Sequence, residues 1–224
     1  MGIKDWPEQQ RPRERLIASG AGALSDAELL AVFLRVGVAG RSAVELGRDL
    51  IGQFGSLNGL FGASLDSFCD VHGLGPAKYA QLQAVMELAR RAIVEQMRHG
   101  VELGSPDAVK QYLRMGMSAQ RHESFVVMFL DVKNRLIASE EMFRGTLTHT
   151  SVHPREVVKA ALAHNAASLL LAHNHPSGSP DPSESDLLLT RTLSAALALV
   201  DVRVLDHFVV AGSHVHSFAE NRQI

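Results

Sequence analysis

The hydrophobic periodicity of the chain changes near residue 100, and this change restricts the possible folds more than any other feature. Before it, residues 1 to about 98 carry apolar positions at helical spacing and contain no strand of alternating pattern. After it, short apolar runs typical of strands alternate with helical stretches. The sequence therefore predicts an α/β protein, with an all-helical domain over 1–99 and a mixed β-sheet flanked by helices over 102–224. We expect the linker at Gly100–Ser105.

Local signals place the helices of the first half. The stretch LSDAELLAVFLRVG has Ser25 as a candidate N-cap, Glu28 three residues later and Gly37 as a stop. RSAVELGRDLIGQFG follows, with Gly55 at its end. A short helix, a glycine turn and a long helix that ends near His99 complete this half.

The second half is predicted to contain strands and helices in alternation. SFVVMFLDVKNRLIASEEMF indicates two strands, 124–130 and 135–143. HPREVVKAALAHN predicts a helix that opens at Pro154. ASLLLAHNH is predicted to form a buried strand, and PSESDLLLTRTLSAALALV a helix with Ser183 as its N-cap. Two final strands are predicted in VRVLDHFVVAG and HVHSFAE.

Composition excludes several classes of protein. Hydrophobic residues make up 46% and charged residues 21%, which suits a packed globular core. A formal net charge of -2 and a pI near 6.6 argue against a general polyanion binder. The single cysteine, Cys69, excludes both a disulfide framework and a cysteine-based metal site. With no signal peptide and no apolar run near the ~20 residues of a membrane helix, we expect a soluble, cytoplasmic protein.

Two histidines stand at the end of the buried strand, in LAHNHPSGSPDPSESDLL. Because residues i and i+2 of a strand share a face, His173 and His175 can direct both imidazoles to one point. Asp186 falls in the first turn of the next helix, three residues after its Ser183 cap. Two imidazoles and one carboxylate leave a fourth position for water, which is the pattern of a catalytic zinc site. The plainer interpretation is a helix cap, since Ser-x-x-Asp is also a capping pattern.

These residues resemble a known family. HNHPSGSPDPSESD is similar to the JAMM motif of the MPN (JAB) metallopeptidases, with His173, His175, Pro176, Ser183 and Asp186 at the defining positions. Further stretches resemble bacterial RadC-like proteins over nearly the whole length: RPRERL, LSDAELLAVFLRVG, GLGPAKYAQLQA, EEMFRGTL, VHPREVVKAALAHNAASLLLAHNHPSG and VRVLDHFVV. The resemblance implies an MPN/JAB-like domain over 102–224.

The resemblance also implies roles for individual residues. It implies one Zn²⁺ ion held by His173, His175 and Asp186, and a glutamate on an early strand that acts as general base. The matching position is Glu123, in HESFVVMFLD, with Glu140 and Glu141 as the fallback candidates. Ser183 would donate a hydrogen bond to the developing oxyanion, or serve only as the helix cap.

Asp206 and His207 leave two interpretations open. They are adjacent in a predicted strand, where they could form a pair that orients a ligand imidazole. Ordinary burial favours the other interpretation, in which His207 is a structural histidine.

The first domain contains a glycine turn between two helices, in VHGLGPAKYAQLQA. It resembles a helix-hairpin-helix, in which Gly73 and Gly75 let the backbone approach a phosphate and Lys78 adds a charge near a helix N-terminus. Such hairpins also serve as plain connectors. If DNA binds here, we expect the binding to be sequence-independent and sensitive to salt.

Three functions follow from these features. The first is a zinc hydrolase that cleaves an amide or isopeptide bond of a peptide or protein substrate. The second is a DNA-binding accessory protein with a structural or vestigial metal site. The third, a metal-dependent nuclease, is disfavoured because two-metal phosphodiester sites use several bridging carboxylates.

Overall fold

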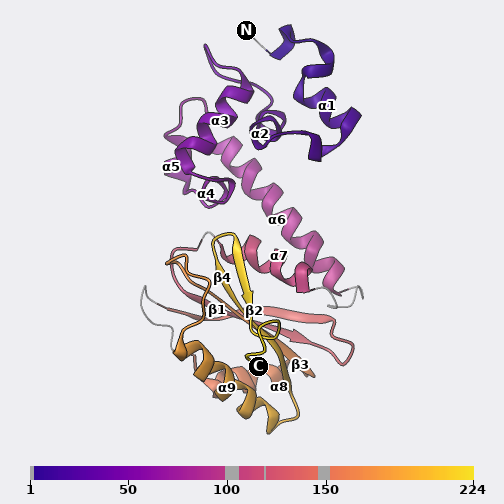
Figure 1. The fold of residues 1–224 in the computed structure, drawn as a ribbon, viewed down its shortest axis with the longest axis vertical. Helices are drawn as coiled ribbons and strands as arrows, with labels where there is room; N and C mark the ends of the chain where they lie inside the picture. Colours follow the sequence, from indigo (N-terminus) through magenta and orange to yellow (C-terminus); the bar gives the residue numbers. More distant parts are fainter. Residues whose placement is uncertain (1–2, 99–105, 119, 146–151) are drawn as a thin grey trace. The chain divides into compact units, whose positions relative to one another are not determined.

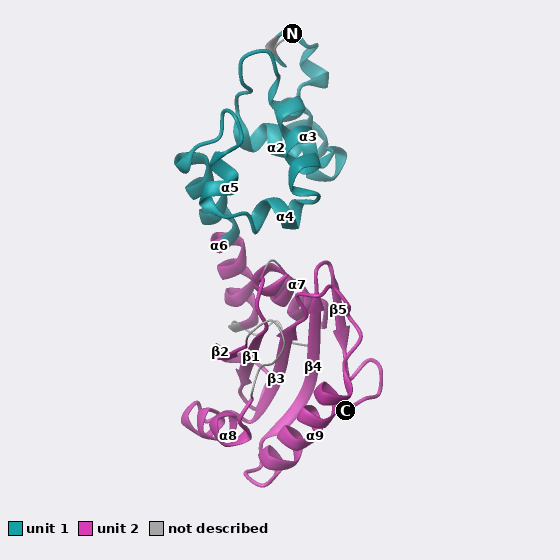
Figure 2. Cartoon of the chain, turned by 90° about the vertical axis from the view of Figure 1, so that its left-hand side faces the viewer, with its two compact units in different colours: residues 1–86 teal, residues 87–224 magenta. Residues whose placement is uncertain are grey.

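The computed structural model describes residues 3–98, 106–118, 120–145 and 152–224 (Figure 1). The chain forms two compact units, residues 1–86 and 87–224, which Figure 2 colours separately. The division falls inside one helix, α6 (Pro76–Arg98). The predicted linker, Gly100–Ser105, lies outside the described residues, so the domain boundary predicted there stays a prediction.

The first unit is helical, and serine residues cap the starts of four of its described helices. The Ser25 hydroxyl accepts a hydrogen bond from the Glu28 backbone N–H, and the Glu28 carboxylate accepts one from the Ser25 N–H. Gly55 ends α3 in the left-handed conformation, with φ of 75°. The elements of this unit are η1 (Ile3–Asp5), η2 (Glu8–Gln10), α1 (Pro12–Ser19), η3 (Ala21–Ala23), α2 (Asp26–Leu34), α3 (Ala43–Phe54), α4 (Leu57–Phe61), α5 (Leu65–Cys69) and the start of α6.

The stop predicted at Gly37 is wrong. Helix α2 ends at Leu34, and Arg35 is its C-cap with φ of 66°. A side chain does not fit at position 37, because a Cβ atom there would lie 2.1 Å from the carbonyl oxygen of Arg41. Close approach of two backbone segments, rather than a helix end, therefore requires the glycine.

The second unit is built on a mixed sheet in the order β2-β1-β3-β4-β5. Strands β3 and β4 pair in parallel, and the other neighbours pair antiparallel. All seven residues of β3 are buried, which explains the apolar run over residues 169–172 at its centre. The strands are β1 (Ser124–Leu130), β2 (Leu136–Arg144), β3 (Ser168–Asn174), β4 (Arg203–Ala211) and β5 (His214–Ser217). The predicted strands and their order along the chain are confirmed.

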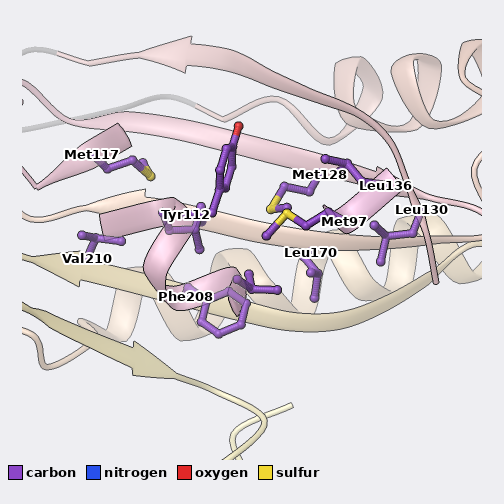
Figure 3. Close-up of a cluster of buried hydrophobic side chains, with 12 residues drawn as sticks. Met97, Tyr112, Met117, Met128, Leu130, Leu136, Leu170, Phe208 and Val210 are labelled. Carbon is purple, nitrogen blue, oxygen red and sulfur yellow. The ribbon is translucent and has the colours of Figure 1, made fainter. Parts of the chain in front are cut away.

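Helices cover both faces of this sheet (Figure 1). Helices α8 (Pro154–Ala163) and α9 (Glu184–Ala198) lie on one face, and α7 (Pro106–Met117) lies on the other. On the α7 side, a buried cluster joins the end of α6, α7 and four strands (Figure 3). A second cluster, with Phe125 and Leu171 from the sheet, packs against Val157 of α8 and Leu193 of α9. These two layers confirm the predicted sheet flanked by helices.

Helix α7 is not among the predicted elements. It buries Val109, Tyr112, Leu113 and Met117, whose i, i+3, i+4 spacing is that of one helix face. The Tyr112 hydroxyl also donates to Ser139 Oγ of β2, at 3.2 Å. The helix therefore covers the sheet face opposite to α8 and α9.

Candidate metal centre

The two histidines of the site lie where β3 ends. His173 is the last residue but one of β3, and only 7% of its surface is exposed. His175 follows the strand, and its backbone N–H donates to the carbonyl oxygen of Val210 in β4, at 2.8 Å. The chain then turns through Gly178, which has φ of 86°. The strand pairing thus continues up to His175 and keeps both imidazoles on one side of the sheet.

Asp186 reaches the same point from the first turn of α9. Ser183 caps this helix, and its hydroxyl and backbone N–H both donate to Asp186 Oδ2, each at 2.7 Å. In return, the Asp186 N–H donates to Ser183 Oγ, at 3.2 Å. The cap predicted at Ser183 is confirmed. It also holds the carboxylate beside the histidines.

The three side chains bring their ligand atoms within the reach of one ion. His173 Nε2 lies 3.0 Å from His175 Nε2 and 3.3 Å from Asp186 Oδ1. His175 Nε2 lies 3.5 Å from Asp186 Oδ2. Two ligands of a tetrahedral zinc ion, each bound at about 2.0 Å, are roughly 3.3 Å apart. The donor set and its spacing therefore fit a zinc ion, and these residues could hold a metal ion.

Electrostatics at the site favour a negative carboxylate beside positive charge. Hydrogen bonding to Asp186 raises the pKa of His175 above its ordinary value, although partial burial opposes this. Burial alone would raise the pKa of Asp186. The His173 and His175 imidazoles beside it outweigh burial, and this pKa lies well below its usual range. A proton and a metal cation therefore compete for the same atoms.

The tautomer of His175 is set by the loop that follows it. His175 Nδ1 lies 2.9 Å from the backbone oxygen of Ser179. A carbonyl oxygen only accepts hydrogen bonds, so Nδ1 carries the proton and donates it. The lone pair of neutral His175 is therefore on Nε2, which is the atom that faces His173 and Asp186.

A cavity of about 550 Å³ opens over the three side chains. Glu123 lines it, just before β1, together with Ser183. Apolar side chains of Phe125, Val152 and Leu189 form another part of its wall. The structure thus brings both predicted catalytic side chains to the cavity that holds the histidines and Asp186.

The fallback glutamates lie elsewhere. Glu140 Oε1 is 2.6 Å from His164 Nε2, at the end of α8. Glu141 Oε1 is 3.4 Å from Arg144 Nε. Both belong to β2, which is separated from β3 by β1. Glu123 is therefore the only one of the three proposed bases that lines the cavity within the described residues.

Of the two interpretations left open for Asp206 and His207, the structure does not show the pair of side chains, although His207 Nε2 itself lies 2.8 Å from His173 Nδ1. The Asp206 carboxylate accepts hydrogen bonds from the backbone N–H groups of His207 and Ala219 and from the Ser217 hydroxyl. Its side chain therefore holds the end of β5 and the turn that follows. Neighbouring residues of a strand point to opposite faces, so the His207 ring lies on the other face of the sheet. Burial lowers the pKa of His207 well below its usual value, so the imidazole is neutral.

Sequence reasoning missed two residues close to the site. Thr190 lies one helical turn after Asp186, and its hydroxyl donates to the Asp186 carbonyl oxygen and contacts His207. Asn174, between the two histidines, accepts a hydrogen bond from the Ser124 N–H, at 2.7 Å. Thr190 could have been found from the sequence, because it lies four residues after Asp186 on the same helix. The contact between Asn174 and Ser124 could not, because it depends on the register of β3 and β1.

The glycine hairpin of the first unit is held by its own contacts. Gly73 has φ of 87°, and a Cβ atom there would lie 1.9 Å from Val38 Cγ1. Lys78 Nζ donates to the Gly73 carbonyl oxygen, at 2.8 Å. At Gly75, by contrast, a Cβ would meet no atom within 4 Å. Packing thus accounts for Gly73, and DNA binding through Gly73, Gly75 and Lys78 stays a prediction.

The fold and the site together define a class of protein: a helical module followed by a JAB-type α/β domain with a candidate metal centre. Residues 103–223 match the family model described as RadC-like JAB domain, and residues 3–80 match that described as UPF0758 N-terminal. No described helix has the length and apolarity needed to cross a membrane.

Full-length relatives agree with these matches. A UPF0758 protein of Herminiimonas arsenicoxydans is 69% identical over 224 residues, which is all of both chains. A UPF0758 protein of Janthinobacterium sp. (strain Marseille) is 66% identical over 221 residues, 99% of each chain. A third, of Thiobacillus denitrificans, is 60% identical over 220 residues, 98% of each chain. The chain belongs to the RadC-like JAB family of UPF0758 proteins.

Proposed function

We propose that this protein is a zinc-dependent hydrolase of the JAMM type, which cleaves an amide or isopeptide bond of a peptide or protein. The observation that carries the proposal is the spacing of His173, His175 and Asp186, whose ligand atoms lie 3.0 to 3.5 Å apart. Among the residues that the structure describes, the candidate group has three protein ligands, as catalytic zinc sites do, whereas structural zinc sites use four. The chemistry that a zinc ion supplies there, when bound, is Lewis acidity toward a carbonyl and a water molecule.

Glu123 is the general base in this proposal. It lines the cavity beside the histidines, and its charge contributes to the raised pKa of His175, which indicates proximity. From that position its carboxylate would take a proton from the attacking water and deliver it to the leaving amine. A carboxylate that serves both steps must stay beside the reacting bond, which its anchored backbone favours.

Ser183 has one hydroxyl proton, which limits its roles. In the structure the hydroxyl donates to Asp186 Oδ2. To stabilise an oxyanion, the proton must turn from Asp186 toward the cavity. Donation to Asp186 and donation to an oxyanion therefore alternate, whereas the cap itself, in which Ser183 Oγ accepts from the Asp186 N–H, needs no hydroxyl proton. We expect Ser183 to contribute to turnover more than to metal binding.

The alternatives receive less support. A phosphodiesterase of the two-metal type would need bridging carboxylates, whereas the candidate group contains one carboxylate and two imidazoles. Sequence-independent DNA binding by the hairpin is compatible with hydrolysis, and it remains a separate prediction about the first unit.

The test combines metal analysis with a substrate screen on the full-length protein. We expect the wild type to contain about one zinc per chain, Asp186→Ala to lose it, and Asp181→Ala to retain it as a matched control in the same loop. In a peptide-library digest, Glu123→Gln should keep zinc and lose cleavage, whereas Glu140→Gln should cleave normally. Normal cleavage by Glu123→Gln would reassign the base, and zinc retained by Asp186→Ala would refute the ligand set.

A further inference from the structure

A third imidazole, that of His207, lies directly behind the candidate metal ligands. His207 belongs to β4, is fully buried, and its Nε2 lies 2.8 Å from His173 Nδ1. Its other ring nitrogen, Nδ1, lies 2.6 Å from Thr190 Oγ1 of α9. The rings of Phe125 and Phe218 pack against it. Both nitrogens of this buried ring thus have polar partners, and one of these partners is a candidate metal ligand.

The direction of each hydrogen bond in this chain follows from donor chemistry. Thr190 Oγ1 lies 2.6 Å from the carbonyl oxygen of Asp186, which can only accept, so the threonine proton goes there. Thr190 Oγ1 must then accept a hydrogen bond from His207, whose Nδ1 therefore carries a proton. A fully buried imidazole with no carboxylate on its ring nitrogens among the described residues is neutral, so His207 Nε2 has a lone pair.

The same logic then fixes His173. Because His207 Nε2 can only accept, the 2.8 Å contact requires the proton of His173 on Nδ1. The lone pair of neutral His173 is then on Nε2, the atom that faces His175 and Asp186. The opposite orientation of the chain would place a proton on Nε2 and block the ligand atom.

We propose that Thr190 and His207 are positioning residues, which hold the proton of His173 on Nδ1 and keep its Nε2 free to bind a metal ion. This inference rests on the metal site of the proposed function. Helix α9 thus acts twice on the site, through the Asp186 carboxylate and through a hydrogen-bond chain that reaches His173 from behind. Outer partners of ligand histidines typically change metal affinity by 10- to 100-fold.

The first test is the zinc affinity of the full-length protein, measured by competition with a chromophoric chelator. We expect Thr190→Val, which keeps shape but removes the hydroxyl, to weaken zinc binding by about 10- to 100-fold. Thr190→Ser should restore affinity. Thr192→Val is the matched control, because Thr192 makes the same bond to the carbonyl oxygen four residues earlier, at 2.8 Å, on the exposed face. Equal zinc affinities of Thr190→Val and wild type would overturn the proposal.

The second test observes the protons themselves. In metal-free wild-type protein, nitrogen-15 spectra of the imidazoles should show His173 and His207 protonated on Nδ1, and Thr190→Val should alter the tautomer of both. A proton on Nε2 of His173 in the wild type would refute the assignment. Neither readout needs turnover, so an absence of amide cleavage with a large effect of Thr190→Val would reject the hydrolase and leave the positioning role standing.

Discussion

Replacing Asn174 should loosen the segment that carries Glu123. Only 2% of the Asn174 surface is exposed, and its side chain faces the residues that lead into β1. Its Oδ1 accepts from the Ser124 N–H at 2.7 Å, and its Nδ2 donates to the His122 carbonyl oxygen at 2.9 Å. These two bonds flank Glu123 on both sides. Asn174→Ala removes both of them and leaves the histidines unchanged.

The expected loss in unfolding free energy depends on whether water can replace each lost hydrogen bond. Ser124 is fully buried, so its N–H would have no water to replace the amide oxygen, which costs about 1–3 kcal/mol. His122 is only partly buried, so water can reach its carbonyl oxygen, and loss of this hydrogen bond costs about 1 kcal/mol. A further contact, from Nδ2 to the Gln120 oxygen, is 3.5 Å long and adds little. We therefore expect a total loss of about 2–4 kcal/mol.

Two measurements check this expectation. Urea denaturation of the full-length variant gives the loss in unfolding free energy, and hydrogen exchange at the Ser124 amide reports the loss locally, whichever unit unfolds first. Asn221→Ala serves as the control, because this exposed side chain makes one bond, to the Ser217 oxygen, and should cost less than about 1 kcal/mol. A loss below about 1 kcal/mol for Asn174→Ala, with unchanged exchange at Ser124, would refute the reasoning.

Three further outcomes are expected. Burial raises the pKa of Asp206, so native protein holds this proton at a pH where unfolded protein, with a pKa of about 4, has lost it. The wild type should therefore lose stability relative to Asp206→Asn as pH rises above about 4. Urea denaturation across pH would contradict this if the unfolding free energy of the wild type, minus that of Asp206→Asn, rose with pH. Gly73→Ala should cost about 2–5 kcal/mol from positive φ and the contact with Val38, and Gly73→Ala in a Val38→Ala background should recover part of it in thermal unfolding. If the hairpin binds duplex DNA, Lys78→Ala should reduce the salt dependence of binding by about one unit of slope, and an unchanged slope would exclude Lys78 from the contact.

Capping signals and strand patterns are local, and the sequence predicts them well. Ser25 with Glu28, and Ser183 with Asp186, begin helices where expected, because each box needs atoms only three residues apart. Gly55 likewise ends α3 as expected. The sequence also places the candidate ligands, since a strand tip and the next helix start are joined by a short loop.

What the sequence could not supply depends on pairing between distant segments. The contact of Asn174 with Ser124 spans fifty residues and exists because β3 pairs with β1 in one particular register. His207 reaches His173 because β4 lies parallel to β3, which a pattern of apolar residues does not specify. The two interpretations left open for Asp206 and His207 have the same origin, since only the register shows that His207 meets a candidate ligand and Asp206 meets Ser217.

The two interpretations of Ser-x-x-Asp, a helix cap and a metal ligand, describe one arrangement. The Ser183 N–H and O–H both bind Asp186 Oδ2, so the cap fixes the rotamer of the carboxylate and leaves Oδ1 facing His173. The start of a helix also favours a negative charge at this position. Atoms of the chain alone therefore hold the ligand atoms at a spacing suited to zinc. Metal binding therefore requires little movement of the three ligand side chains. The affinity for metal should then depend more on Thr190 and His207 than on the loop between His175 and Ser183.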